Sequence, residues 1–334
     1  MRIGSQMYRI MQSFPPISVS SSEDKIPVNI FLYEEFIVLL MKLHQVMKVQ
    51  HPVSFFFLLI SFVLSFHSCE NKGKERLIDT IGLPGNASKQ KLKNIDKFNN
   101  DTKTIHVLVA LCDNKYQGIV PVPEKIGNGQ DPDQNLYWGA AYGVRTYFKK
   151  SKDWKFLKSE KTDSIRMERL IFQHVTKKNY YLVADAYDGQ YIKDCTKDFF
   201  YSSSGQMKDV VSVNNTTIGI YGNSSLVSYV GHDGLMDFQL SESFKNTDGK
   251  TRDCIVLACY SKKFFSPLLQ ETKAHPLVWS SHLMAPEAYI LHDALTGYLH
   301  NESGEQIRTR AALAYSKYQK CSEKAARNLL VTGW

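Results

Sequence analysis

Two short apolar stretches near the middle of this chain each end in a side chain that can do chemistry. Residues 226–230 (LVSYV) lead through Gly231 into His232, and residues 254–258 (CIVLA) lead directly into Cys259. A thiol beside an imidazole can form a strong nucleophile, because the imidazole takes the proton that the thiol releases. The two stretches therefore predict a nucleophilic site, provided that the fold brings both side chains to the same place.

Strands are the elements that must position this pair. Apolar, β-branched runs of this length are typical of buried strands in a parallel sheet. In open α/β sheets, ligands bind beyond the carboxyl ends of the strands. We therefore expect His232 and Cys259 to face each other over one crevice at that edge.

The rest of the chain alternates between segments of strand and helix character. We expect further strands at 104–112, 154–157, 180–187, 217–221 and 276–279, and helices at 136–148, 164–176, 191–201, 264–270, 286–299 and 306–330. This alternation predicts an α/β fold with a doubly wound, mostly parallel sheet that carries helices on both faces.

Three carboxylates and a second thiol are expected at the same edge of the sheet. Asp113, Asp185 and Asp188 lie near the ends of two predicted strands and could form a pocket for a basic side chain. Solvated loop carboxylates explain them equally well. Cys112 ends the first predicted strand and is a rival nucleophile, although no His-Gly element accompanies it.

Composition and missing motifs exclude several function classes. The 334 residues are 43% hydrophobic, and the net charge of +8 is spread along the chain without a basic block interleaved with aromatic residues, which argues against nucleic-acid binding. No C-x-x-C pair, H-E-x-x-H helix or G-x-S-x-G elbow is present, and the Gly127-Asn128-Gly129 loop lacks the third glycine of a dinucleotide fingerprint. The cysteines other than Cys69 and Cys259 are expected to be mostly buried free thiols.

The N-terminal third has the character of a targeting segment. Residues 54–66 are uncharged and apolar, and their length suits a signal-peptide core better than a membrane-spanning helix. We interpret residues 1–40 as an over-extended start, with a genuine extension as the alternative, and residues 41–68 as the signal peptide. Cys69 follows as a lipidation site, which predicts anchoring in a bacterial cell envelope. The alternative is an ordinary secretory signal and a secreted protein.

The remaining chain divides into a polar tether and one folded body. Residues 69–103 are rich in Lys, Asn, Asp and Ser and show little periodicity, which is typical of a linker. Residues 104–334 are predicted to form a single α/β domain.

The two central motifs resemble those of a known superfamily. Residues 229–234 (YVGHDG) and 256–261 (VLACYS) are similar to the strand ends of the caspase–gingipain–legumain cysteine peptidases. The resemblance implies a caspase-haemoglobinase-like fold, a polypeptide substrate and no metal or organic cofactor. It also implies that Cys259 is the nucleophile, that His232 handles the proton, and that backbone N–H groups of Cys259 and of Asp233 or Gly234 form the oxyanion hole.

Departures from the family pattern leave a second hypothesis open. Asp233 stands where the family usually has glycine, and Leu257 and Lys262 replace a usual Asp and Gly. Asp233 either obstructs the crevice or orients His232. The first hypothesis is an active cysteine endopeptidase, and the alternative is a catalytically inactive envelope lipoprotein of the same fold that binds or scaffolds. The missing motifs count against a third reading, a different α/β hydrolase or a nucleotide-binding protein.

Overall fold

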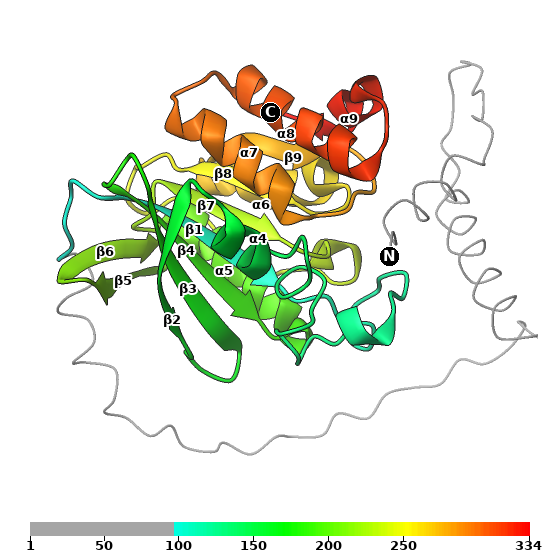
Figure 1. Cartoon of the computed structure of the whole chain (residues 1–334), viewed down its shortest axis with the longest axis horizontal. Coiled ribbons are helices and arrows are strands. Elements are labelled where there is room, and N and C mark those ends of the chain that lie inside the picture. The colour runs from blue at the N-terminus through cyan, green and yellow to red at the C-terminus, as the bar shows by residue number, and fades with distance from the viewer. Residues whose placement is uncertain (1–96) are drawn as a thin grey trace, which may run out of the picture. The chain divides into compact units, whose positions relative to one another are not determined.

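A computed structural model describes residues 97–334 (Figure 1). The expectations for residues 1–40, for the signal peptide at 41–68, for lipidation of Cys69 and for most of the tether lie outside the described residues. Among the described residues, no helix is long and apolar enough to cross a membrane.

Eight strands form the main sheet, in the order β10-β9-β8-β7-β1-β4-β3-β2. Their bounds are β1 Lys103–Ala110, β2 Trp154–Glu160, β3 Arg166–His174, β4 Tyr180–Tyr187, β7 Leu226–Val230, β8 Asp253–Leu257, β9 His275–Ser280 and β10 Leu330–Val331. The five central strands β4, β1, β7, β8 and β9 pair in parallel. The predicted α/β class with a mostly parallel sheet is thus confirmed.

Antiparallel strands flank this centre, and one of them corrects an expectation. Residues 164–176 were expected to form a helix, but β3 occupies them and pairs antiparallel with β2 and β4. The uninterrupted apolar run Leu170-Ile171-Phe172 is compatible with either a helix or a strand period, so periodicity alone cannot decide. Pairing within the β3–β4 hairpin decides in favour of the strand.

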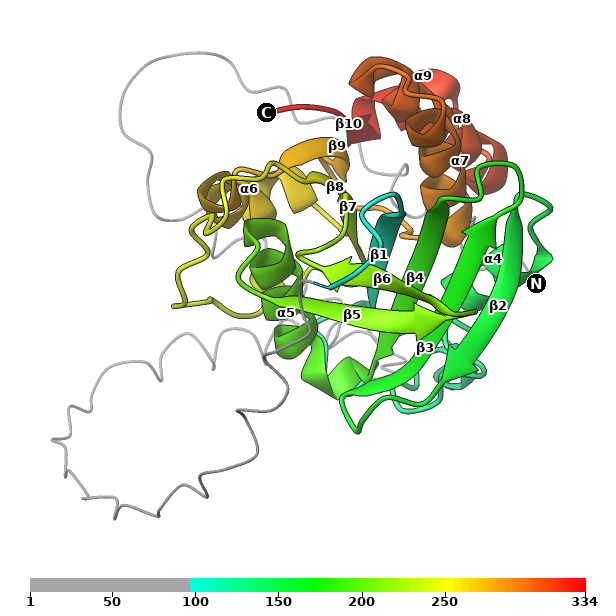
Figure 2. The ribbon, with the colours of Figure 1, turned by 90° about the vertical axis from the view of Figure 1, so that its left-hand side faces the viewer.

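Helices cover both faces of the sheet. The main helices are α4 Val144–Lys150, α5 Ile192–Ser204, α6 Ser261–Thr272, α7 Ala288–Leu299, α8 Gly304–Gln319 and α9 Glu323–Leu329, with single 3-10 turns η2 Glu124–Ile126, η3 Gly189–Tyr191 and η4 Gly234–Met236. Helices α5 and α6 pack on one face, whereas α4, α7 and α8 pack together on the other. Figure 2 shows these two groups on opposite sides of the central strands.

Alternate residues of each strand supply two hydrophobic cores, one on each face. Along β7, Leu226 and Val230 belong to the core under α7 and α8, whereas Val227 and Tyr229 belong to the core under α5 and α6. Successive side chains of a strand point to opposite faces, so a central strand must be apolar throughout. This requirement explains why β7 and β8 have no polar/apolar alternation in the sequence.

Two predicted helices have different bounds in the structure. The helix expected at 136–148 begins only at Val144, after a series of turns. The helix expected at 306–330 is split, because Lys320 adopts a left-handed conformation with φ 60° and Ser322 starts α9 by accepting a hydrogen bond from the N–H of Ala325. The last residues of this segment leave the helix and form β10.

A hairpin of β5 Lys208–Val213 and β6 Thr216–Tyr221 forms a separate two-stranded sheet on the α5 face. Buried polar groups attach it to the main sheet. The imidazole of His106 accepts a hydrogen bond at Nδ1 from the N–H of Tyr221 (3.0 Å), and its Nε2 lies 3.1 Å from Asp185 Oδ2. Arg169 donates to both oxygens of Asp185, at 2.6 and 2.7 Å.

This cluster corrects the expectation for Asp185. The residue lies inside β4 and points to the face covered by the hairpin, not to the carboxyl edge, and it is 0% exposed. Burial opposes ionisation, but the hydrogen bonds and the charge of Arg169 prevail and hold the pKa of Asp185 well below its usual range. Asp185 is therefore an internal counter-ion and cannot line a pocket at the edge.

Candidate active site

His232 and Cys259 lie at the same edge of the sheet. Strands β7 and β8 are parallel neighbours whose last paired residues are Val230 and Leu257. Each reactive residue follows its strand's last paired residue by two positions, and the ladder continues through the hydrogen bond from Gly231 N–H to Leu257 O (3.1 Å). Adjacent strands are about 4.8 Å apart, so the two backbones leave the sheet side by side. The predicted placement on neighbouring strands is correct.

The topology marks this edge as the place for a ligand. The chain runs from β1 to β4 on one side, and then returns to β7 on the other side of β1. A crevice opens where the direction of winding changes, beyond the carboxyl ends of the strands. His232 follows β7, one of the two strands at this point.

The imidazole of His232 is held by a carboxylate that the sequence did not single out. Its Nε2 lies 2.7 Å from Asp237 Oδ2, which also accepts the N–H of Gly118 at 2.9 Å. Burial alone would raise the pKa of Asp237, but the hydrogen bonds from His232 and Gly118 outweigh it and lower that pKa. An ionised Asp237 keeps the proton of neutral His232 on Nε2 and leaves Nδ1 as the basic nitrogen. Within residues 97–334, no hydrogen bond engages Nδ1 of His232.

Local folding explains why Asp237 rather than Asp233 orients His232. The side chain of Asp233 accepts the N–H of Leu235 (3.0 Å) and thereby starts the 3-10 turn η4. This turn reverses the chain and brings Asp237, five residues after His232, back to the imidazole. The backbone of His232 is held as well, because the hydroxyl of Tyr229 donates a hydrogen bond to His232 O at 2.7 Å.

Asp233 itself is a buried carboxyl group with one unsatisfied oxygen. It is 0% exposed, and its Oδ2 has no hydrogen-bond partner among the described residues. Burial raises the pKa of Asp233 to about 8, the N–H of Leu235 opposes this, and the charge of Asp237 adds to it. Asp233 is therefore mostly protonated at neutral pH, so this position adds bulk and a proton rather than a full negative charge.

The sulfur of Cys259 lies against the backbone of the loop that follows β9. Its Sγ accepts the N–H of Met284 at 3.4 Å and lies 3.5 Å from Met284 O. Burial raises the pKa of the Cys259 thiol, the N–H of Met284 lowers it, and an ionised Asp233 raises it again. Cys259 as a whole residue is partly buried, in contrast to the fully buried Cys112, Cys195 and Cys254.

Backbone conformation places Cys259 directly before a helix. Tyr260 adopts a left-handed conformation with φ 48°, and α6 starts at the next residue. The Tyr260 N–H donates to His282 O at 3.0 Å. A non-glycine residue in this conformation is strained, and such strain is concentrated at functional sites. The turn places Cys259 between the end of β8 and the first residue of α6.

Backbone donors stand free around the two reactive residues. In the described part of the chain, the N–H groups of Cys259, Asp233 and Gly234 have no hydrogen-bond acceptor. Unpaired N–H groups beside a nucleophile are suited to bind a developing oxyanion. These are the three residues that the family resemblance implied for this role.

The acidic residues at the edge are occupied by loop contacts. Gln130 Nε2 donates to Asp113 Oδ2 (2.8 Å) and to Asp188 Oδ1 (2.6 Å), so the two carboxylates are neighbours as expected. Asp113 also accepts the N–H groups of Lys115 and Tyr116. These bonds tie both carboxylates into their loops, but an ionised carboxylate has about four acceptor sites and can still accept a further donor. A pocket for a basic side chain at Asp113 and Asp188 stays a prediction.

Cys112 is not equipped as a nucleophile. It is 0% exposed and packs in the core under α7 and α8. Burial raises the pKa of its thiol to about 12, against a lowering hydrogen bond with Tyr137. Cys112, Cys195 and Cys254 are buried free thiols, as predicted.

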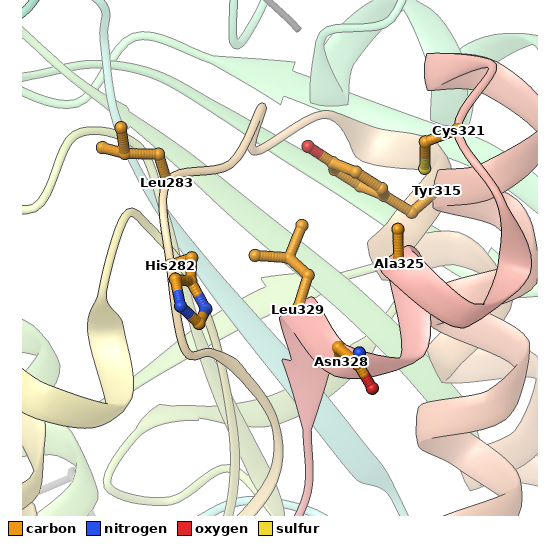
Figure 3. Close-up of a pocket in the computed structure, with 7 residues that line it drawn as sticks. All are labelled: His282, Leu283, Tyr315, Cys321, Ala325, Asn328 and Leu329. Atoms are coloured by element: carbon orange, nitrogen blue, oxygen red, sulfur yellow. The ribbon is translucent and has the colours of Figure 1, made fainter. Parts of the chain in front are cut away.

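A cavity that the sequence did not indicate lies beyond Met284. It has a volume of about 300 Å³, and its walls come from the loop after β9, from α8 and from α9 (Figure 3). His282 and Leu283 lie on one side, with Leu329 opposite them. Only the fold reveals this cavity, because these elements are far apart in the sequence. No group of three metal-ligating side chains occurs among the residues that the structure describes.

The fold and the site define an α/β protein with a thiol and a carboxylate-supported imidazole at one sheet edge. No family model, curated protein or solved structure matches the chain.

Proposed function

We propose that this protein is a cysteine endopeptidase that resembles the caspase–gingipain–legumain enzymes. The observation that carries the proposal is the equal placement of His232 and Cys259 two residues beyond the ends of neighbouring parallel strands. The orientation of His232 by Asp237 supports it, because a base needs a fixed tautomer.

The proposed reaction uses only residues of this chain. The Cys259 thiol gives its proton to Nδ1 of His232, and the resulting thiolate attacks a peptide carbonyl carbon. The N–H groups of Cys259, Asp233 and Gly234 stabilise the oxyanion. The tetrahedral intermediate collapses, the imidazolium protonates the departing amine, and an acyl-enzyme remains. Water, deprotonated by His232, then attacks the thioester and releases the acid and the thiol.

A peptide-based electrophile that acylates thiols tests this proposal. Cys259→Ala should abolish labelling while the far-ultraviolet circular dichroism spectrum stays unchanged. The control is Cys195→Ala, which removes a buried thiol of helix α5 and should leave labelling intact. Persistent labelling of Cys259→Ala would show that Cys259 is not the nucleophile.

A catalytically inactive binding protein of the same fold is the second candidate. The contact of Cys259 with Met284 and the raised pKa of its thiol favour it. The alkylation rate of Cys259 separates the two: an enzyme should show an acceleration that depends on His232, and an inactive protein should react like an ordinary buried thiol.

We also propose that the protein is lipid-anchored through Cys69 in a bacterial cell envelope. The support is the apolar 54–66 segment followed by Cys69 and a polar stretch. A single acylated terminus would hold the folded body at the membrane surface, with the tether between them.

A further inference from the structure

The cavity near Cys259 has almost entirely apolar walls. Leu283 comes from the loop after β9, Tyr315 from α8, and Ala325 and Leu329 from α9. Figure 3 shows Leu329 between the loop and the two helices, with Tyr315 and Ala325 beside it. No carboxylate, lysine or arginine lines the space. A cationic ligand would find no counter-ion among the lining residues, and His282 is the one imidazole beside the otherwise apolar walls.

The loop from His282 to Met284 connects this cavity to the thiol. Met284 contacts Cys259 Sγ through its N–H, whereas its neighbour Leu283 lines the cavity. Tyr260, the residue after Cys259, donates its N–H to His282 O, and the two rings lie 5.8 Å apart. The cavity wall and the thiol are therefore linked through two consecutive residues, Leu283 and Met284.

Size and exposure indicate what the space accommodates. Ligand pockets usually have volumes of about 300–1,000 Å³, and this one is at the lower limit. It suits one large side chain better than a cofactor. Leu283 is 40% exposed, so this part of the cavity wall faces solvent and a side chain can reach it from outside.

We infer that this cavity is a subsite for an apolar side chain of a polypeptide substrate, within two residues of the bond that Cys259 attacks. The inference rests on the proposed function and adds a substrate class to it. A peptide whose carbonyl carbon meets Sγ places a nearby side chain between Leu283 and Leu329. Burial of a leucine or phenylalanine there should raise kcat/KM roughly 10- to 150-fold over a peptide that leaves the cavity empty.

Filling the cavity tests the inference. Ala325→Trp inserts an indole from α9, and Lys324→Trp places the same group at the exposed neighbouring position of that helix as a control. With a peptide library, we expect Leu, Phe or Met to be enriched at one position within two residues of the cleaved bond. Ala325→Trp should lower kcat/KM for such a peptide at least 10-fold, and Lys324→Trp should not. The rate of iodoacetamide alkylation at Cys259 should be equal in both variants, because that reagent does not use the cavity.

A binding measurement separates this inference from the proposed function. The neutral apolar dye N-phenyl-1-naphthylamine should fluoresce with wild-type protein and with Lys324→Trp, and at least 5-fold less with Ala325→Trp. Asn328→Phe, at an exposed position that also lines the cavity, replaces Ala325→Trp if that variant does not fold. Cleavage without an apolar preference, or equal effects of the two tryptophans, overturns the inference and leaves the peptidase standing. Dye binding without any peptide cleavage overturns the peptidase and, with it, the assignment of a substrate subsite.

Discussion

The imidazole of His232 depends on Asp237 for its orientation. The carboxylate holds Nε2 at 2.7 Å and is itself held by the N–H of Gly118, so two loops cooperate to fix one ring. Asp237 is a positioning residue in the proposed reaction, since it acts through His232 and not on the substrate. Its removal should therefore lower the rate of catalysis, and a residue that still accepts the Nε2 proton should restore part of it.

We expect Asp237→Ala to reduce kcat/KM roughly 100-fold, the loss that small misplacements of a catalytic group can cause. Asp237→Asn should recover part of this loss, because its amide oxygen can still accept the Nε2 proton of His232 and hold the ring. Asp101→Ala, at an exposed aspartate far along the sequence, is the control. Equal losses for Asp237→Ala and Asp237→Asn would refute the positioning role of Asp237.

The buried carboxyl of Asp233 makes a separate prediction about stability. Its folded pKa of about 8 lies above the unfolded value of about 3.9, so the folded state holds this proton more tightly. The contribution of the Asp233 proton to the free energy of unfolding is fully present below about pH 4. It falls by up to about 1.4 kcal/mol per pH unit above that and is lost once the pH has risen through about 8. Asp233→Asn cannot ionise and should lose less stability over this range.

Urea unfolding at pH 5, 7 and 9 measures this effect. The free energy of unfolding of Asp233→Asn relative to wild type should increase with pH, whereas Asp101→Asn should show no such trend. Parallel pH profiles for wild type and Asp233→Asn would mean that Asp233 is already ionised in the folded protein.

At the scale of residues, sequence reasoning found the reactive pair but not its support. His232 and Cys259 were recognisable because each directly follows an apolar strand. Asp237 and Met284 were not, because a tight turn and a distant loop bring them to the site. A carboxylate five residues after a histidine is a weak signal unless the turn between them is known.

At the scale of elements, the end of β7 depends on one glycine. Gly231 has φ 151°, and a Cβ there would lie 2.7 Å from Ala110 O on the neighbouring strand β1. Only glycine combines this conformation with so close a backbone approach. The position lets the chain leave β7 and deliver His232 to the edge.

We expect Gly231→Ala to lower the free energy of unfolding by roughly 1–3 kcal/mol. The alanine would be strained by the positive φ, and its Cβ would also clash with Ala110 O. Gly249→Ala is the matched control: its φ is also positive, at 71°, but nothing lies within 4 Å of its Cβ position. Thermal and urea unfolding should show a larger loss for Gly231→Ala, and alkylation of Cys259 should lose its dependence on His232 in that variant only. Equal losses for the two variants would contradict the role of the close contact with β1.

The elements that could be predicted were those with a single physical interpretation. The strand expected at 180–187 matches β4 Tyr180–Tyr187, since a strand buried on both faces is mostly apolar on both. The segment that became β3 could not be assigned, because pairing with a neighbouring strand and not local sequence selected its conformation. The α8–α9 break depended on the conformation of Lys320, for which a lysine gives no signal.

At the scale of the whole molecule, the anchor proposal predicts where the protein resides. Cys69→Ser in the full chain should move the protein from the membrane fraction to the soluble fraction and abolish incorporation of labelled palmitate. Cys321→Ser, in the folded body, is the control and should change neither result. Incorporation of palmitate into Cys69→Ser would rule out Cys69 as the acylated residue.

The sequence by itself determined the α/β class, the neighbouring strands that carry His232 and Cys259, and the edge at which both end. These features follow from local hydrophobic periodicity and from sheet geometry, because neighbouring parallel strands have their carboxyl ends at the same edge of the sheet. The tertiary structure alone decided which carboxylate orients the imidazole, that Asp185 is an internal counter-ion, and that a cavity adjoins the thiol. Each of these depends on contacts between segments far apart in the chain or across a turn, and their distances are set by packing rather than by sequence spacing.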